Sequence, residues 1–420
     1  MNGTVPVMDL LAHSRALLCV SVDPWNQPHG GQTTFARHLL AAFKSDFAVV
    51  STCAEALPVG RWVARNFEGT QIPFLNIGSL ARSSSRRPRI PARISVYCMA
   101  ARRMATVHRS GIPNIFIDDP ELALAASNYR WSSVCYNVAG VFNPAALSRY
   151  PAARLLSQFC ESAILRAIRK LDPEVIMAAG DSTLVERLRS IESLSRCRIE
   201  ALPTRVNLDR FFPEPQCVAR DRAGLARDRR VLIALGRLSW IKGWDLLLRA
   251  VAFLKRTDPG ILLVFVGDGE DRDKITAEVR AQGVADNIHI TGFVTQESVR
   301  TFLNAADVCV VGSHSEGWSV AMLEALACGK PIVSTRVSGS REMIAEGLNG
   351  FVVEGRDPET YAAAVRKALS LRDAEHVSRK IAARYSLAGL AHELRAKWTA
   401  LQDAPGGYYG EFRAQGVVAK

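Results

Sequence analysis

Short apolar runs alternate with helical patterns along the first half of the chain. In residues 30–43, Phe35, Leu39 and Phe43 recur at helical spacing, and further helices are expected near 93–108 and 154–170. Strands that alternate with helices predict a parallel sheet covered on both faces. The runs of strand length lie at residues 16–22, 47–52, 112–118, 132–138 and 174–180.

A second alternation of the same kind follows a segment rich in proline and polar residues. Each unit predicts a doubly wound α/β domain, so the fold class is two such Rossmann-like domains that face a central cleft. The predicted strands lie at 229–238, 261–269, 288–294, 307–313, 331–335 and 349–354. The boundaries are a first domain at 1–200, a linker at 201–216, a second domain at 217–385, and a terminal helix with a loose tail at 386–420.

Length and composition agree with two globular domains. A chain of 420 residues with 48% hydrophobic and 22% charged residues is too long for one compact core and too apolar to be disordered. No apolar run of about 20 residues predicts a transmembrane helix, and the first residues predict a short leader rather than a signal peptide. The nine scattered cysteines, without a CxxC pair, favour reduced thiols in the cytoplasm and no zinc site.

The net charge of +12 is concentrated in the first half, where residues 1–200 hold 23 Lys and Arg against 15 Asp and Glu. Residues 69–117 contain no acidic residue and eight arginines, with apolar residues interleaved from 82 to 109. This basic segment fits an anionic membrane surface, at the inner face of the cell membrane, or attraction of a phosphorylated substrate; a solvated helix face remains the alternative. One aromatic residue and no recognition motif argue against nucleic acid.

Two loops after predicted strands carry the polar residues that suggest chemistry. In "GRLSWIKG", Arg237 and Lys242 stand five residues apart in a glycine-flanked loop, which suits a diphosphate, although both fit ordinary surface cations as well. In "SEGWSVAMLEALACGKP", Gly317 permits a tight turn and Ser319 is a helix N-cap candidate. The free N–H groups of that helix would attract an anion.

Two glutamates lie eight residues apart in this second loop and helix. A carboxylate accepts hydrogen bonds from vicinal sugar hydroxyls, so Glu316 and Glu324 suit a ligand with hydroxyls at both ends and phosphates between them. The competing interpretation takes Glu324 as an exposed helix residue and Glu316 as a partner for the helix dipole.

The order and spacing of these motifs resemble the retaining GT-B glycosyltransferases of family four. The matching segments are "GRLSWIKG", "VFVGDGE", "HITGFV", "SEGWSVAMLEALACGKPIVST" and "NGFVVE". The resemblance covers residues 229–400 well and extends weakly over 15–215, through the Gly30-Gly31 loop and "LPTRVNLDRFFP".

The resemblance implies roles for individual residues. Arg237 and Lys242 would hold the donor diphosphate, Glu324 the ribose, and Glu316 the transferred sugar. Arg237, Lys242 and Glu316 would form the catalytic set, which requires no metal or cofactor beyond the nucleotide sugar. The implied donor-binding residues are Gly31, Gly236, Arg237, Lys242, Phe293, Val294, Glu316, Gly317, Ser319, Val320 and Glu324.

The acceptor side departs from the family pattern. Many members have a histidine after the strand that corresponds to "SSVCYN", where this chain has Asn137, and Gly30 with Asn137 would face the acceptor. The linker has Thr204-Arg205 where Asn-Gly is usual, and the second domain has Ser338-Gly339 where Gly-Gly is usual. The D-x-D at 271–273 lies at a charged helix start and is discounted as a metal site.

The resulting expectation is transfer of a hexose-type sugar from a UDP or GDP donor to a glycan or lipid-linked acceptor in bacterial surface polysaccharide synthesis. The alternatives are a nucleotide-sugar epimerase of related fold and a partner subunit that has lost catalysis. A dehydrogenase is disfavoured because "GDGEDR" lacks the third glycine of a dinucleotide fingerprint, and neither a Walker A motif nor a serine-hydrolase elbow occurs.

Overall fold

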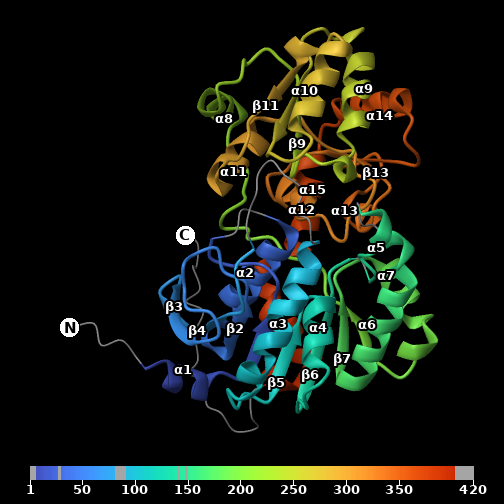
Figure 1. Ribbon diagram of the computed structural model, residues 1–420. Helices are drawn as coiled ribbons and strands as arrows, with labels where there is room; N and C mark the ends of the chain where they lie inside the picture. Colours follow the sequence, from blue (N-terminus) through green and yellow to red (C-terminus); the bar gives the residue numbers. More distant parts are fainter. Residues whose placement is uncertain (1–5, 27–29, 81–90, 141, 147–149, 403–420) are drawn as a thin grey trace, which may run out of the picture.

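The chain folds into two α/β domains, which form the lower and upper lobes in Figure 1. The computed structural model describes residues 6–26, 30–80, 91–140, 142–146 and 150–402. The predicted fold class is confirmed, because each lobe contains a largely parallel sheet with helices on both faces.

The first domain is built on one sheet of eight strands within the described residues. All neighbouring strands run parallel except the two strands at one edge of the sheet, which form an antiparallel hairpin. That edge hairpin and the last strand were not predicted, since the hairpin is half-exposed and carries mixed polar residues. In sheet order the strands are β3 (Trp62–Phe67), β4 (Thr70–Asn76), β2 (Phe47–Ser51), β1 (Ala16–Cys19), β5 (Asn114–Ile117), β6 (Ser133–Val138), β7 (Val175–Ala178) and β8 (Ile199–Ala201).

The helices expected at 30–43 and 93–108 are present, and the helix expected at 154–170 is interrupted at Leu156. A short helix in the expected leader and two helices between later strands, Pro120–Ala126 and Ser182–Arg189, were not predicted. The helices are α1 (Val7–His13), α2 (Gly31–Phe43), α3 (Ala92–His108), α4 (Pro120–Ala126), α5 (Pro151–Leu155), α6 (Ser157–Leu171) and α7 (Ser182–Arg189).

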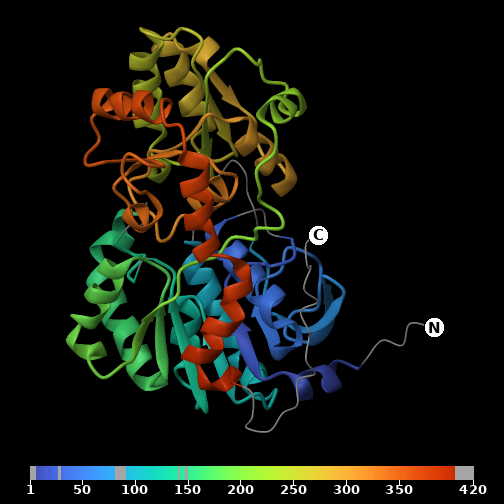
Figure 2. The same ribbon diagram turned by 180° about the vertical axis from the view of Figure 1, so that it is seen from behind.

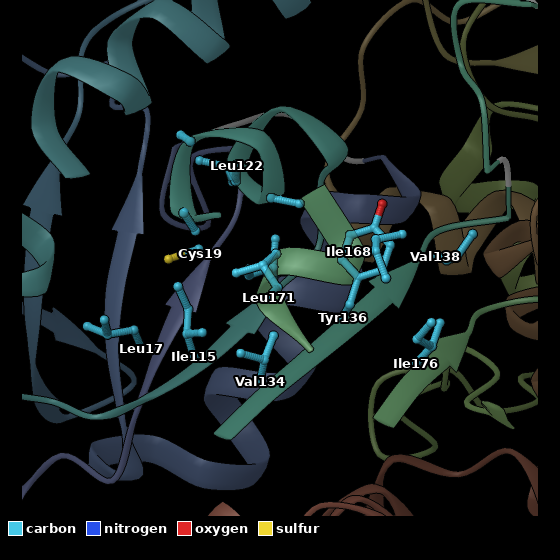
Figure 3. Close-up of a cluster of buried hydrophobic side chains, with 14 of the residues drawn as sticks. Leu17, Cys19, Ile115, Leu122, Val134, Tyr136, Val138, Ile168, Leu171 and Ile176 are labelled. Carbon is cyan, nitrogen blue, oxygen red and sulfur yellow. The ribbon is translucent and has the colours of Figure 1, made fainter. Parts of the chain in front are cut away.

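Alternate residues of the central strands fill two separate cores. Figure 3 shows Leu17, Ile115, Val134 and Tyr136 on one face of the sheet, packed with Leu171 and other residues from α4 and α6. The intervening residues face the other side and pack against α2 and the end of the chain. A strand buried on both faces explains why these segments appear as continuous apolar runs.

The second domain has a six-stranded sheet, all parallel, in which strand order reverses between β9 and β12. This is the doubly wound order, and it places a crevice beyond the carboxyl ends of those two strands. In sheet order the strands are β11 (Ile288–Ile290), β10 (Leu262–Val266), β9 (Val231–Leu235), β12 (Val308–Val311), β13 (Ile332–Thr335) and β14 (Gly350–Val353). The helices are α8 (Gln216–Ala223), α9 (Trp244–Lys255), α10 (Arg272–Ala281), α11 (Gln296–Ala305), α12 (Val320–Ala327), α13 (Ser340–Met343), α14 (Pro358–Ala368) and α15 (Ala374–Arg384).

The end of the chain returns to the first domain. Figure 2 shows this segment descending the back of the molecule, where α16 (Leu390–Lys397) lies against the lower lobe. Trp398 is fully buried there, and its indole Nε1 donates to Ser133 Oγ at 2.7 Å. Arg205 of the linker pairs with Glu393 of α16, so the residue that departs from the family pattern fixes the linker to this helix. The predicted loose tail, 403–420, lies outside the described residues.

The structure describes four of the eight arginines in the basic segment. On α3, Val96, Ala100 and Met104 are buried while Arg102 is exposed, and Arg93 forms an ion pair with Glu121 at 2.8 Å. Arg82, Arg86, Arg87 and Arg89 lie outside the described residues. None of the helices within the described ranges is both long and apolar enough to cross a membrane.

The packing of Trp398 predicts that the end of the chain is an integral part of the first domain. Replacing Trp398 with Ala removes a fully buried ring and a hydrogen bond, and we expect a loss of about 3–5 kcal/mol in the free energy of unfolding, measured by chemical denaturation. The control Leu348→Ala alters a side chain that is 59% exposed and should cost less than about 0.5 kcal/mol. Equal stability of the two variants would contradict this account.

Candidate functional site

Two loops meet at the point where strand order reverses in the second domain. The loop after β9 runs from Gly236 to Gly243, and the loop after β12 runs from Gly312 to the start of α12. Gly243 has φ of +64°, and a Cβ there would lie 1.7 Å from the carbonyl oxygen of Gly312. Glycine at 243 is therefore required for the two loops to pack together.

An ion pair joins these loops. Lys242 Nζ lies 2.7 Å and 2.9 Å from the two carboxylate oxygens of Glu316, and Ser313 Oγ donates to Glu316 Oε1 at 2.6 Å. The Glu316 side chain is 12% exposed, and that of Lys242 is 32% exposed. Two predicted catalytic residues are thus brought together, and the charge of each is balanced by the other. The third, Arg237, is exposed and lines the same small cavity of about 30 Å³.

The start of α12 lies beside this ion pair. Ser319 is the N-cap, as predicted, with its hydroxyl accepting from the backbone N–H of Met322 at 3.4 Å. Figure 1 places α12 and α13 at the face of the second domain that meets the first. Ser319 lines the small cavity together with Gly236, Lys242 and Glu316. This arrangement combines two cations with free backbone N–H groups, which suits a diphosphate.

The other glutamate faces a different cavity. Glu324 and Val320 line a space of about 370 Å³ between the two domains, whereas Glu316 and Ser319 line the small cavity. The two glutamates therefore line different cavities. That they contact the two carbohydrate ends of one ligand remains a prediction. A further cavity of about 520 Å³ lies elsewhere, between the linker and α15.

The protonation of Glu324 is altered by its surroundings. Burial raises the pKa of its carboxyl to about 8, and the nearby Arg210 only partly offsets this effect. The side chain is partly exposed to the cavity, although protein surrounds it on its other sides. His38, which lines the same cavity, has its pKa lowered to about 4 by burial and by Arg210 and Arg37. At neutral pH this cavity thus holds a neutral imidazole and a largely protonated Glu324.

Sequence reasoning missed most of the wall of this cavity. Arg210 is held by Gln296, which accepts from its guanidinium, and its own carbonyl accepts from Arg300 at 3.2 Å. The only sequence signal was the linker motif "LPTRVNLDRFFP", which contains Arg210. The first domain contributes residues that no motif marked. The missed lining residues include Trp25, Arg37, His38, Asn66, Arg210 and Gln296.

The remaining predicted donor residues take varied positions. Phe293 is 73% exposed beyond β11, and Val294 is partly buried beside it. Gly31 begins α2, and a Cβ there would meet nothing within 4 Å, so the unliganded backbone alone does not require glycine. Gly30 is the extended N-cap of α2. Their roles toward donor and acceptor remain predictions.

Asn137 lies within β6, where the predicted strand at 132–138 placed it. Its side chain is 1% exposed and donates from Nδ2 to Asp118 Oδ1 at 2.5 Å, so it is not presented to an acceptor here. Burial and the neighbouring Asp119 raise the pKa of Asp118, so this pair is a buried polar contact beneath the cleft. The residues that follow the strand into the cleft are Ala139 and Gly140.

Metal ligands are not grouped anywhere in the ranges that the structure describes. Of the D-x-D pair, Asp271 is 3% exposed and accepts from Trp244 Nε1 at 3.2 Å and from Lys274 Nζ at 2.8 Å. Its oxygens are thus already used by neighbouring side chains.

Comparison with known proteins gives the family of the second domain. Residues 218–385 match the family model described as glycosyl transferases group 1. A D-inositol 3-phosphate glycosyltransferase from Geodermatophilus obscurus is 40% identical over 185 residues, which is 42% of this chain and 41% of that protein. The chain thus aligns with about two fifths of that relative's length.

Solved structures match both domains. Sucrose-phosphate synthase from Thermosynechococcus elongatus superposes with a TM-score of 0.76 at 19% identity, over 91% of this chain and 97% of that one. Anabaena HepE in complex with UDP and glucose gives a TM-score of 0.68 at 16% identity, over 91% and 99% of the two chains. Residues 218–385 therefore belong to the glycosyl transferases group 1 family, and the two domains together have the GT-B fold.

Proposed function

We propose that this protein is a glycosyltransferase that takes a hexose-type sugar from a nucleotide-diphosphate donor. The observation that carries the proposal is the pairing of Lys242 with Glu316 beside Arg237 and the start of α12. These groups supply cations and N–H donors for a diphosphate, next to a carboxylate for sugar hydroxyls. A donor that spans the small cavity and the interdomain cavity would place its ribose at Glu324.

Donor binding would exchange partners at the ion pair. The diphosphate attracts Lys242 and Arg237, and Glu316 then becomes available to the hydroxyls of the sugar. When the glycosyl–phosphate bond breaks, negative charge grows on the diphosphate, and the two cations stabilise that charge in the transition state. By the family resemblance, the acceptor attacks from the same face and the departing phosphate receives its proton, which retains the anomeric configuration. This route requires no metal or other cofactor.

The donor base and the acceptor are parts of the proposal. UDP is favoured because the Anabaena neighbour is described with UDP and glucose, and GDP is the alternative. A glycan or lipid-linked acceptor, in bacterial surface polysaccharide synthesis at the cytoplasmic face of the membrane, was the expectation from sequence. The name of the Geodermatophilus relative favours a second candidate, a phosphorylated polyol. An epimerase or a partner subunit without catalysis would need no acceptor.

Release of nucleoside diphosphate tests the proposal. Purified protein is incubated with UDP-, GDP- or ADP-glucose, each alone and with inositol phosphate or a lipid-linked glycan. Release that depends on both a donor and an acceptor supports transfer and identifies both substrates. Conversion of the donor sugar without an acceptor would support the epimerase, and binding without turnover would support the partner subunit.

Variants of the two predicted binding groups should separate binding from turnover. Lys242→Ala should lower kcat about 100-fold with a smaller change in KM, because the diphosphate gains charge in the transition state. Glu324→Ala should instead weaken donor binding about tenfold. Titration calorimetry and steady-state kinetics measure the two effects, and unchanged values in both variants would refute the site assignment.

The raised pKa of Glu324 predicts that donor binding depends on pH. Ribose hydroxyls donate best to the ionised carboxylate, whereas the unliganded side chain is mostly protonated below pH 8. Donor affinity should therefore increase between pH 6 and 8, by up to about tenfold per pH unit, and level off above pH 8. Glu324→Gln, which cannot ionise, should lose this increase. Identical pH profiles for the two proteins would show that Glu324 does not contact the ribose.

The basic segment predicts association with anionic membranes if the acceptor is lipid-linked. Replacing Arg86, Arg87, Arg102 and Arg103 with Ser should reduce co-sedimentation with vesicles that contain anionic lipid, since each cation near such a surface contributes about 1 kcal/mol. The control changes four arginines outside this segment: Arg187, Arg189, Arg196 and Arg198. An equal reduction in both variants would indicate a general charge effect rather than a docking segment.

A further inference from the structure

The two domains touch at a pair of glycines beside the ion pair. Gly140 follows β6 in the first domain and has φ of +79°, and Gly317 directly follows Glu316 in the second. A Cβ on Gly140 would lie 2.0 Å from the Cα of Gly317, and a Cβ on Gly317 would lie 2.9 Å from the Cα of Gly140. A distance below 3 Å to a backbone atom cannot be accommodated by a small side-chain adjustment. This close approach of the two domains therefore requires glycine at both positions.

A second contact between the domains lies at the end of β7. The backbone N–H of Asp181 donates to Ser338 Oγ at 3.2 Å, and Asp181 Oδ2 accepts from the backbone N–H of Gly339 at 3.4 Å. The other carboxylate oxygen of Asp181 caps α7 by accepting from Leu184 N at 3.1 Å. One side chain thus ends a helix in the first domain and holds a loop of the second.

Both contacts converge on the same short segment. Gly339 packs closely on the ring of Trp318. A Cβ at Gly339 would lie only 2.9 Å from the indole carbon Cε3, so a larger residue would clash with the ring. Trp318 is 8% exposed and follows Gly317 in the chain. Residues 316–318 are therefore held by Gly140 from one side and, through Gly339 and Trp318, by Asp181 from the other.

We propose that Gly140 and Asp181 are positioning residues that set Glu316 for sugar transfer when the cleft closes. Neither is among the donor-binding residues named above; they act through Gly317 and Trp318. The inference rests on the proposed function for its catalytic consequence, whereas closure itself is independent of that function. It also gives a physical reason for Ser338, because a glycine there would have no hydroxyl to accept from Asp181.

The test compares Gly140→Ala with Gly111→Ala. Gly111 has φ of +80°, and a Cβ there would meet no heavy atom within 4 Å, so the control has the same backbone strain without a clash between the domains. Asp181→Asn keeps an oxygen for the α7 cap and replaces the acceptor for Gly339 with a donor.

Small-angle scattering measures closure of the cleft, titration with the nucleoside diphosphate measures nucleotide binding, and steady-state kinetics measure kcat.

Gly140→Ala should raise the radius of gyration and lower kcat at least tenfold, while the nucleotide Kd should change less than threefold. Asp181→Asn should show smaller changes in the same directions. Gly111→Ala should match the unsubstituted protein in all three. Equal scattering and equal kcat for the Gly140 and Gly111 variants would overturn the inference. If the unsubstituted protein transfers no sugar, the proposed function fails, while opening of the cleft by Gly140→Ala alone would still support the positioning contact.

Discussion

The ion pair between Lys242 and Glu316 is the interaction on which the site depends. Both charges lie in a partly buried crevice, where a lone carboxylate or ammonium group would be strongly destabilised. Each group therefore compensates the charge of the other. The ligand that we propose, a nucleotide sugar, would offer an anion to Lys242 and hydroxyls to Glu316, and so would replace the partner of each.

The fold places this pair by topology rather than by sequence proximity. Lys242 and Glu316 are 74 residues apart, yet they follow the neighbouring strands β9 and β12. Parallel strands direct their following loops to one edge of the sheet, and the reversal of strand order opens a crevice there. The first domain repeats this plan, and its loops after β6 and β7 reach the same crevice through Gly140 and Asp181. The site is thus closed by contacts between two similar sheet edges.

The sequence predicted the second domain better than the first, for a physical reason. Arg237, Lys242, Glu316 and Glu324 lie in loops and a helix start whose positions follow from strand order, so their spacing carries spatial information. The strand that holds Asn137 was placed correctly, but the side chain is buried against Asp118, directly after the neighbouring strand β5, a contact that no local pattern indicates.

Contacts between distant segments left no local pattern to detect. Nothing near Trp398 indicates that it packs into the first domain, and nothing near His38 indicates that it lines the same cavity as Glu324. The half-exposed strand β3 was missed because its polar and apolar residues do not alternate clearly. These features depend on how the two domains and the chain end meet, which the periodicity of single elements does not encode.

The most direct test of the central claim is an experimental structure with a bound, non-hydrolysable nucleotide sugar. The account predicts that Lys242 Nζ leaves Glu316 and lies within about 3 Å of a phosphate oxygen, a charge-assisted contact, while Glu316 accepts from a sugar hydroxyl. An intact Lys242–Glu316 pair, with the ligand bound elsewhere in the cleft, would contradict the account.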